Sequence, residues 1–208
     1  MESLDNGHVV LPSDFAESIL TGEHVRIHPW ARGCYARDML YFLWKMMENE
    51  GMTNTVFYER TSTEDKMPIS TEMDLIEFCH YFSSVSNRLL LIPQHIETQE
   101  VMGFAWYDGV ILGVSGKGSM FYRKKFWGEM AKEASTLCLK YGFEILGFQK
   151  VWGLSPWQAS VKHRARLGFK EVAEVPDAFQ DAKGKSRSMY VGVCTKESFN
   201  GRTIEKRG

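Results

Sequence analysis

The 208-residue sequence has few cysteines and no net excess of charge. Its four cysteines are Cys34, Cys79, Cys138 and Cys194, which lie 45, 59 and 56 residues apart. No C-x-x-C pair is present, so the spacing indicates neither a zinc knuckle nor a dithiol redox site. Free buried thiols in a reducing compartment explain this usage, which predicts a cytoplasmic protein. The net charge of −1 argues against a protein that coats DNA with a uniformly basic surface.

Long hydrophobic runs are also missing. The first fifteen residues contain no charged region followed by an apolar run, so we expect no secretory signal. No apolar stretch approaches the roughly 18 residues that a membrane span needs, and we expect no membrane partner.

Several familiar motifs fail on their spacing. Gly113–Ser119 looks like a phosphate loop, but it lacks four residues between its glycines and an adjacent Lys-Ser or Lys-Thr pair. G-x-G-x-x-G and G-x-S-x-G are absent, so neither a dinucleotide site nor a nucleophile elbow is indicated. His24 and His28 share one face of a predicted strand without a third ligand nearby, and we predict no metal.

What is present is a globular composition, 44% apolar and 25% charged, at a length typical of one domain. We expect a loose arm over 1–20, one domain over 21–199 and a polar, frayed tail over 200–208. Periodicity predicts the order β-α-α-β-β-β-α-β-α-β-β, which is an α/β fold with one mixed sheet covered by helices. Pro29 is expected to end the first strand, and Gly116-Lys117-Gly118 to interrupt a later one. The expected strands cover 24–30, 88–96, 101–107 with its continuation over 110–114, 120–122, 150–154, 169–175 and 187–194, and the helices cover 36–50, 71–82, 128–148 and 158–167.

The most informative segment is 121–134, where a strand is followed by a basic turn and a helix that begins near Gly128. A helix N-terminus exposes unpaired N–H groups and the positive end of its dipole, which suits a pyrophosphate. Arg123, Lys124 and Lys125 add positive charge at the same place.

This segment resembles the GNAT superfamily of acyl-CoA-dependent N-acyltransferases, most closely the branch that acetylates ribosomal-protein and other amino termini. That branch reads roughly Trp-Gly-x-Gly-Tyr-Ala-x-Glu-Ala, and this chain has Trp127-Gly128-Glu-Met130-Ala131-Lys-Glu-Ala, one residue shorter and without the second glycine. Downstream, Ser160 and Leu167-Gly168-Phe169 follow the family spacing, with Trp157 where the family has Asn. The resemblance is specific over about 117–196 and topological over 24–107.

The resemblance implies a central mixed sheet in which two parallel strands, around 118–122 and 150–154, splay apart to hold acyl-CoA. Backbone groups of the first splayed strand would pair with pantetheine, and turn amides from Arg123 to Ala131 would hold the pyrophosphate. Ser160, with Lys162, Arg164 and Arg166 around it, would lie near the other end of the cofactor. The residues expected to contact acetyl-CoA or another acyl-CoA are Met120, Phe121, Tyr122, Arg123, Lys124, Lys125, Trp127, Gly128, Met130, Ala131 and Ser160.

The implied reaction is the direct attack of an amine on a thioester, which needs an acid for the leaving thiolate. Where many family members have a Glu, this chain has Lys117, so the usual base is missing. Tyr122, His163 and Ser160 are the protic side chains predicted to take part, and water is an equally consistent base.

The acceptor stays open between a small amine, a protein amino terminus and a base amine of nucleic acid. Residues 48–77 carry a local charge of −6 and 117–132 one of +4, which predicts opposite entrances for a cationic amine and an anionic cofactor. An inactive GNAT-like binding module and a nucleic-acid-binding protein are the alternatives, and a homodimer is possible.

Overall fold

The computed structural model describes residues 19–30, 37–53, 71–84, 88–180 and 185–205. Its sheet has eight strands in the order β1-β2-β3-β4-β5-β6-β8-β7, and only β5 and β6 are parallel. The α/β class with one mixed sheet is therefore confirmed. The strands are β1 (Leu20–Thr21), β2 (Val25–Trp30), β3 (Leu89–His95), β4 (Gly103–Ile111), β5 (Ser115–Tyr122), β6 (Lys150–Ser155), β7 (Lys170–Gln180) and β8 (Ser186–Thr195). The helices are α1 (Arg37–Asn49), α3 (Thr71–Ser84), α4 (Glu129–Lys140), α5 (Gln158–Arg166) and α6 (Lys196–Glu205).

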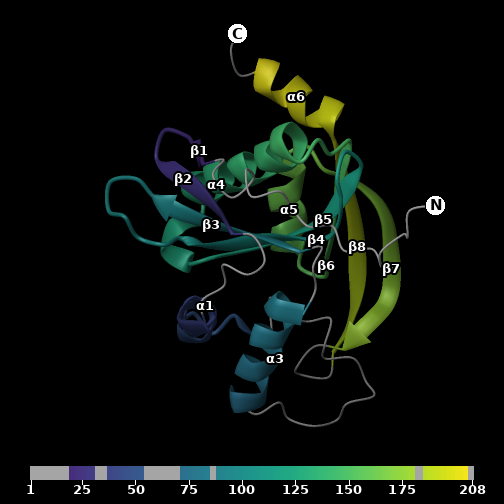
Figure 1. The fold of residues 1–208 in the computed structure, drawn as a ribbon. Helices are drawn as coiled ribbons and strands as arrows, with labels where there is room; N and C mark the ends of the chain where they lie inside the picture. The colour runs from purple at the N-terminus through teal and green to yellow at the C-terminus, as the bar shows by residue number, and fades with distance from the viewer. Residues whose placement is uncertain (1–18, 31–36, 54–70, 85–87, 181–184, 206–208) are drawn as a thin grey trace, which may run out of the picture.

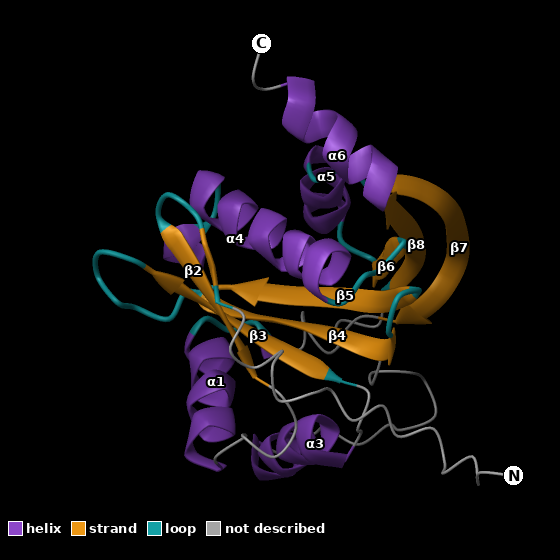
Figure 2. Ribbon diagram, turned by 45° about the horizontal axis from the view of Figure 1, so that its top comes forward, coloured by secondary structure: helices purple, strands orange, loops and turns teal. Residues whose placement is uncertain are grey.

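Helices cover both faces of the sheet (Figures 1 and 2). α4 and α5 lie on one face, and α1 and α3 lie on the other. The core on the α4 face includes Tyr107 and Tyr122, whereas the core on the α1 and α3 face includes Trp106 and Phe121. Consecutive residues of one strand thus belong to different cores, because successive side chains of a strand point to opposite faces.

β5 is longer than the sequence suggested. Gly116-Lys117-Gly118 was expected to interrupt a strand, but all three residues pair within β5. The break falls earlier, in a turn at 112–114. The glycines are accommodated because Gly116 packs against Phe148 and Gly118 packs against Tyr107 and Val151, where a Cβ would crowd them. Here glycine marks close packing rather than a strand end.

Two other expected ends lie elsewhere. Pro29 does not end β2, which continues to Trp30. β1 pairs only with Arg26 and Ile27, so within the described part of the chain no strand faces the missing N–H of Pro29. α6 continues to Glu205, so residues 200–205 of the expected polar tail are helical. Phe199, in this helix, is buried, and the centroid of its ring lies 5.2 Å from that of Phe143. Residues 1–18 and 206–208 of the predicted arm and tail lie outside the described residues.

The fold opens between β5 and β6. They pair at only three positions, from Ser115↔Lys150 to Lys117↔Trp152, while β5 stays bonded to β4 as far as Tyr122. β6 continues to Ser155 along β8. α4 and a following π-helical turn (Tyr141–Ile145) make the crossover that a parallel pair requires. The predicted parallel, splayed strand pair is therefore confirmed.

None of the helices in the described part of the chain is long and apolar enough to cross a membrane.

Candidate active site

A cavity of about 550 Å³ occupies the gap between β5 and β6. One wall is β5 from Lys117 to Tyr122, and the other is formed by Leu154 and Ser155 with residues of α5. At the apex of the gap the two backbones remain close, because a Cβ on Gly153 would lie 3.3 Å from the carbonyl oxygen of Gly118. The cavity is lined by residues of both sheet faces, so it connects the α4 side with the α1 and α3 side.

A chain of polar side chains crosses the α4 side of the cavity. The hydroxyl oxygen of Ser135, which is fully buried on α4, lies 3.1 Å from the Tyr122 hydroxyl and 2.9 Å from Nε2 of His163 on α5. It also donates to the carbonyl of Ala131 at 2.7 Å. The structure thus brings Tyr122 and His163, both predicted from the sequence, to the two ends of one chain. Ser135 was missed, although a serine next to the apolar stripe of an amphipathic helix is the available sign of a buried polar residue.

Burial sets the protonation states of this chain. It raises the pKa of the Tyr122 hydroxyl well above 10, so this phenol keeps its proton. It also lowers the pKa of His163 below 6.5, helped by the positive charges of Arg166 and Lys132. Tyr122 is therefore suited to donate a proton, and His163 is neutral near pH 7.

The N-terminus of α4 opens beside the cavity. Gly128, its N-cap, has φ 93° and ψ −132°, and no side chain caps the helix. The first-turn N–H groups of a helix have no acceptors within the helix, so they are available to an anion. Trp127, Gly128 and Ala131 line the cavity, while Met130 packs against the core on the α4 face. The exposed Trp127 indole N–H donates to the carbonyl of Tyr122 at 2.8 Å, so this carbonyl, expected to pair with pantetheine, already has a donor.

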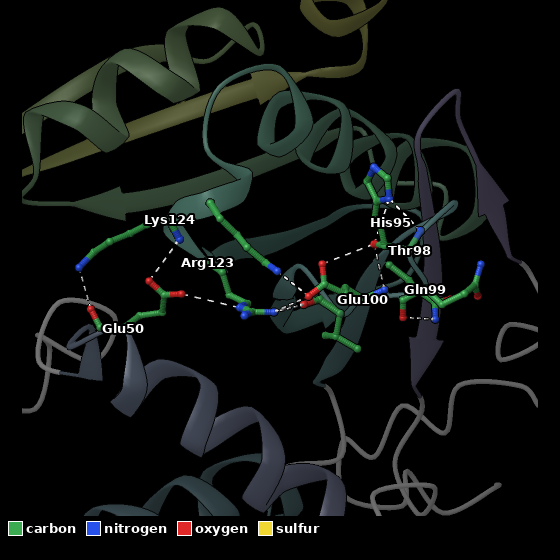
Figure 3. Close-up of polar contacts among 10 residues, drawn as sticks. Glu50, His95, Thr98, Gln99, Glu100, Arg123 and Lys124 are labelled. Atoms are coloured by element: carbon green, nitrogen blue, oxygen red, sulfur yellow. Dashed lines mark hydrogen bonds and ion pairs between the residues drawn. The ribbon is translucent and has the colours of Figure 1, made fainter.

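The side chains of the basic turn are bonded to residues of other segments (Figure 3). Arg123 lies between Glu50 and Glu100, with Nε 3.7 Å and Nη1 3.8 Å from their carboxylates. Lys124 donates from Nζ to the carbonyl of Glu50 at 2.9 Å, and Lys125 pairs with Glu100 at 2.5 Å. None of these three cations is among the described residues that line the cavity. The backbone N–H groups of Arg123, Lys124, Phe126 and Trp127 also have acceptors already, so the expected phosphate contacts fall to the N–H groups from Gly128 onward.

Positive charge reaches the cavity from α5 instead. Lys162 and Arg166 line it together with Ser160 and His163. Arg164 also lines it, but its guanidinium donates to both carboxylate oxygens of Glu171, at 3.2 and 3.0 Å, and to the carbonyl of Tyr190. Arg164 thus holds α5 against the β7–β8 hairpin, whereas Lys162 and Arg166 extend the positive field.

A second buried polar group lies on the opposite face of the sheet. Asp108 on β4 accepts hydrogen bonds from the Tyr81 hydroxyl at 2.7 Å, from the Trp106 indole at 2.9 Å and from Arg88. The Arg88 guanidinium stacks on the Tyr81 ring, 3.4 Å from its centroid. Burial and the charge of Asp108 raise the pKa of Tyr81. Sequence reasoning missed this group because its members come from α3, from the residue before β3 and from β4, which only folding brings together.

No family model matches the sequence. Solved structures do share its fold. A GNAT-family protein from Chromobacterium violaceum superposes with a TM-score of 0.67 at 15% identity, over 96% of this chain and 95% of the other. Spermidine N-acetyltransferase from Vibrio cholerae, solved in complex with CoA and spermine, superposes with a TM-score of 0.63 at 13% identity, over 84% and 98% of the two chains.

A T. thermophilus protein named as an acetyltransferase has a TM-score of 0.65 at 20% identity, over 91% of this chain and 96% of the other. At such identities the similarity concerns the fold: this chain folds as GNAT acetyltransferases do, and the expected GNAT-like sheet is confirmed.

Proposed function

Starting from this GNAT fold, we propose that the protein is an N-acyltransferase that moves an acetyl or related acyl group from CoA to an amine. The observation that carries the proposal is the cavity between β5 and β6, which opens beside the uncapped N-terminus of α4. In this arrangement the pantetheine arm lies along β5 at Met120 and Phe121, and the pyrophosphate lies over the N–H groups that follow Gly128. Spermidine N-acetyltransferase, which shares the fold, was solved with CoA, and this supports an acyl-CoA as the cofactor.

The electrostatics of the cavity agree with such a ligand. The described residues that line it include Lys117, Lys162 and Arg166 and no carboxylate. An anionic cofactor would offset the repulsion among these cations, and the α4 dipole would add to the attraction. The side chains of Arg123, Lys124 and Lys125 are already bonded to Glu50 and Glu100, so the phosphate contacts are assigned to the N–H groups at the start of α4.

In the proposed reaction the amine nitrogen attacks the thioester carbon, so that a C–N bond forms and the C–S bond breaks. The nitrogen loses its proton to water, and the thiolate of CoA takes a proton from the Tyr122 hydroxyl. Ser135 lies between Tyr122 and His163, so it can return a proton to Tyr122 from that side. Ser160 lines the same wall as His163 and has the role of a cofactor contact.

Calorimetric titration with acetyl-CoA, with CoA for comparison, tests the binding step, and release of free CoA thiol in the presence of amines tests the transfer. We expect the protein to bind both acetyl-CoA and CoA, and to release free CoA thiol from acetyl-CoA only when an amine is present. In Tyr122→Phe we expect slower turnover with unchanged affinity for acetyl-CoA, because the phenol is assigned to the acid step. Failure to bind acetyl-CoA would refute the proposal, and binding without transfer to any amine would indicate an inactive GNAT-like binding module.

Transfer to the base amines of nucleic acid is the remaining alternative acceptor class. Oligonucleotides in the amine panel test it, because phosphate contacts would give a steep loss of affinity as salt rises.

A further inference from the structure

The cavity reaches the face of the sheet that carries α1 and α3. Along β5, Met120 and Tyr122 belong to the α4 side, whereas Phe121 belongs to the core of the other face. Trp106, the register partner of Ser119 on β4, belongs to the same face as Phe121. A cofactor that lies on the α4 side would therefore meet its acceptor on the α1 and α3 side.

The wall on this acceptor side is apolar. It consists of Met52, after α1, Tyr81 on α3, Trp106 on β4 and Phe121 on β5, all of which line the cavity. Met52 and Tyr81 are half-buried and pack against the core formed by Trp106 and Phe121. Three aromatic rings and a flexible thioether make a surface that binds hydrocarbon and aromatic groups well.

On this side the charged side chain among the described residues that line the cavity is a cation, Lys117. Lys117, at the apex of the gap, lines the cavity, and Asp108, its register partner on β4, does not. Asp108 is instead bonded to Arg88, Tyr81 and Trp106, so its charge is balanced within the protein. With the reacting nitrogen at the apex, a second ammonium group on the acceptor would lie against the apolar wall, with no cavity carboxylate among the described residues to pair with it.

None of the described acids of segment 48–77 lines the cavity. Glu48 forms an ion pair with Lys45 at 2.5 Å, and Glu50 is bonded to Arg123 and Lys124. Residues 54–70, which hold three of its acids, lie outside the described residues.

We infer that the acceptor subsite, formed by Met52, Tyr81, Trp106 and Phe121, takes a primary amine carried on an apolar alkyl or aryl body, in preference to a polyamine. The inference rests on the proposed function, because it assigns the other half of the same cavity. The amine nitrogen lies at the apex beside Lys117 and Ser119, and the apolar body lies against the four wall residues. Removing this body from water stabilises the complex in proportion to its apolar area.

The sharpest test compares hexylamine with 1,5-diaminopentane, which has the same chain length and a second amine in place of the terminal methyl group. Hexylamine and phenethylamine are compared with 1,5-diaminopentane and spermidine as acceptors, by kcat/KM for thiol release at fixed acetyl-CoA. We expect hexylamine to exceed 1,5-diaminopentane by about tenfold or more, in line with the discrimination that apolar pockets achieve. Calorimetric titration of each amine into CoA-saturated protein measures the same preference without turnover.

Two matched variants distinguish the effect of a charge in the cavity wall from the effect of the same charge elsewhere on the protein surface. Met52→Glu places a carboxylate in the wall, and Ile76→Glu places one on the same face, at a 69% exposed position of α3 that does not line the cavity. We expect Met52→Glu to reduce the preference for hexylamine by about tenfold, because the added charge can pair with the second ammonium group. Ile76→Glu should leave the preference as it is.

The outcomes are distinguishable. A wild-type protein that prefers the diamine, or equal shifts in the two variants, overturns the inference while leaving the transferase proposal standing. Loss of acetyl-CoA binding to the wild-type protein refutes the proposed function, and the acceptor assignment fails with it.

Discussion

Gly128 gives the most direct test of where the cofactor phosphates lie. At φ 93° and ψ −132° its backbone adopts a conformation that only glycine enters readily, yet a Cβ added there would meet nothing within 4 Å. The effect of Gly128→Val is therefore conformational rather than steric. Holding a β-branched residue in such a conformation costs about 1–3 kcal/mol. The chain can relieve this strain by rotating the peptide units that enter α4, which redirects the first N–H groups of the helix.

Loss of one charge-assisted hydrogen bond to a phosphate costs about 1.5–3 kcal/mol. Gly128→Val should therefore weaken acetyl-CoA binding by about 10-fold to 100-fold, at 1.4 kcal/mol for each factor of ten. Titration calorimetry measures the affinity, and urea unfolding measures the accompanying loss of stability.

Gly109→Val is the matched control. Gly109 also has a positive φ, of 57°, and open space around its Cβ position, but it does not line the cavity. We expect it to lose stability and keep its affinity for acetyl-CoA. If both variants bind acetyl-CoA as the wild type does, the pyrophosphate does not lie at the start of α4.

Three further predictions concern buried side chains on the α4 side. Folding lowers the pKa of His163, so below about pH 6.5 the unfolded chain binds the proton more readily than the folded one, and the free energy of unfolding should fall. Urea unfolding measured between about pH 8 and about pH 5 should show a smaller fall in His163→Gln than in the wild type. Ser135→Ala removes the hydroxyl that links Tyr122 to His163 and should lower the free energy of unfolding by about 1–3 kcal/mol, so an unchanged value in urea titrations would argue against the chain. Burial raises the pKa of the Cys138 thiol to about 12, so this cysteine should react with a disulfide reagent at about pH 8 only after unfolding. The difference in labelled thiols between the wild type and Cys138→Ser identifies the signal of Cys138. Rapid labelling of Cys138 in the native protein would contradict its burial.

Local patterns in the sequence were sufficient for most of the fold. Alternation and helical spacing placed the helix near Arg37–Asn49 and the strand pair near Leu89–His95 and Gly103–Ile111, because these patterns depend on which face of an element is buried. The Trp127-Gly128 segment identified the turn before α4, since a helix start after a strand has recognisable local chemistry. The same signals misplaced the boundaries at Gly116 and at Pro29, where packing and a missing partner strand outweigh the usual breaking effect of glycine and proline.

The site depended on contacts that no local pattern records. The sequence alone named Tyr122 and His163 as protic residues, and only the tertiary structure placed Ser135 between them, on a third element. Likewise, the basic character of 123–125 is evident from the sequence, but its pairing with Glu50 and Glu100 depends on how α1 and the β3–β4 turn pack against it. Sequence thus determined which groups are available, because composition and periodicity are local. Which of them face the cavity was decided by contacts between distant segments, because burial and electrostatics depend on all the neighbours that folding brings together.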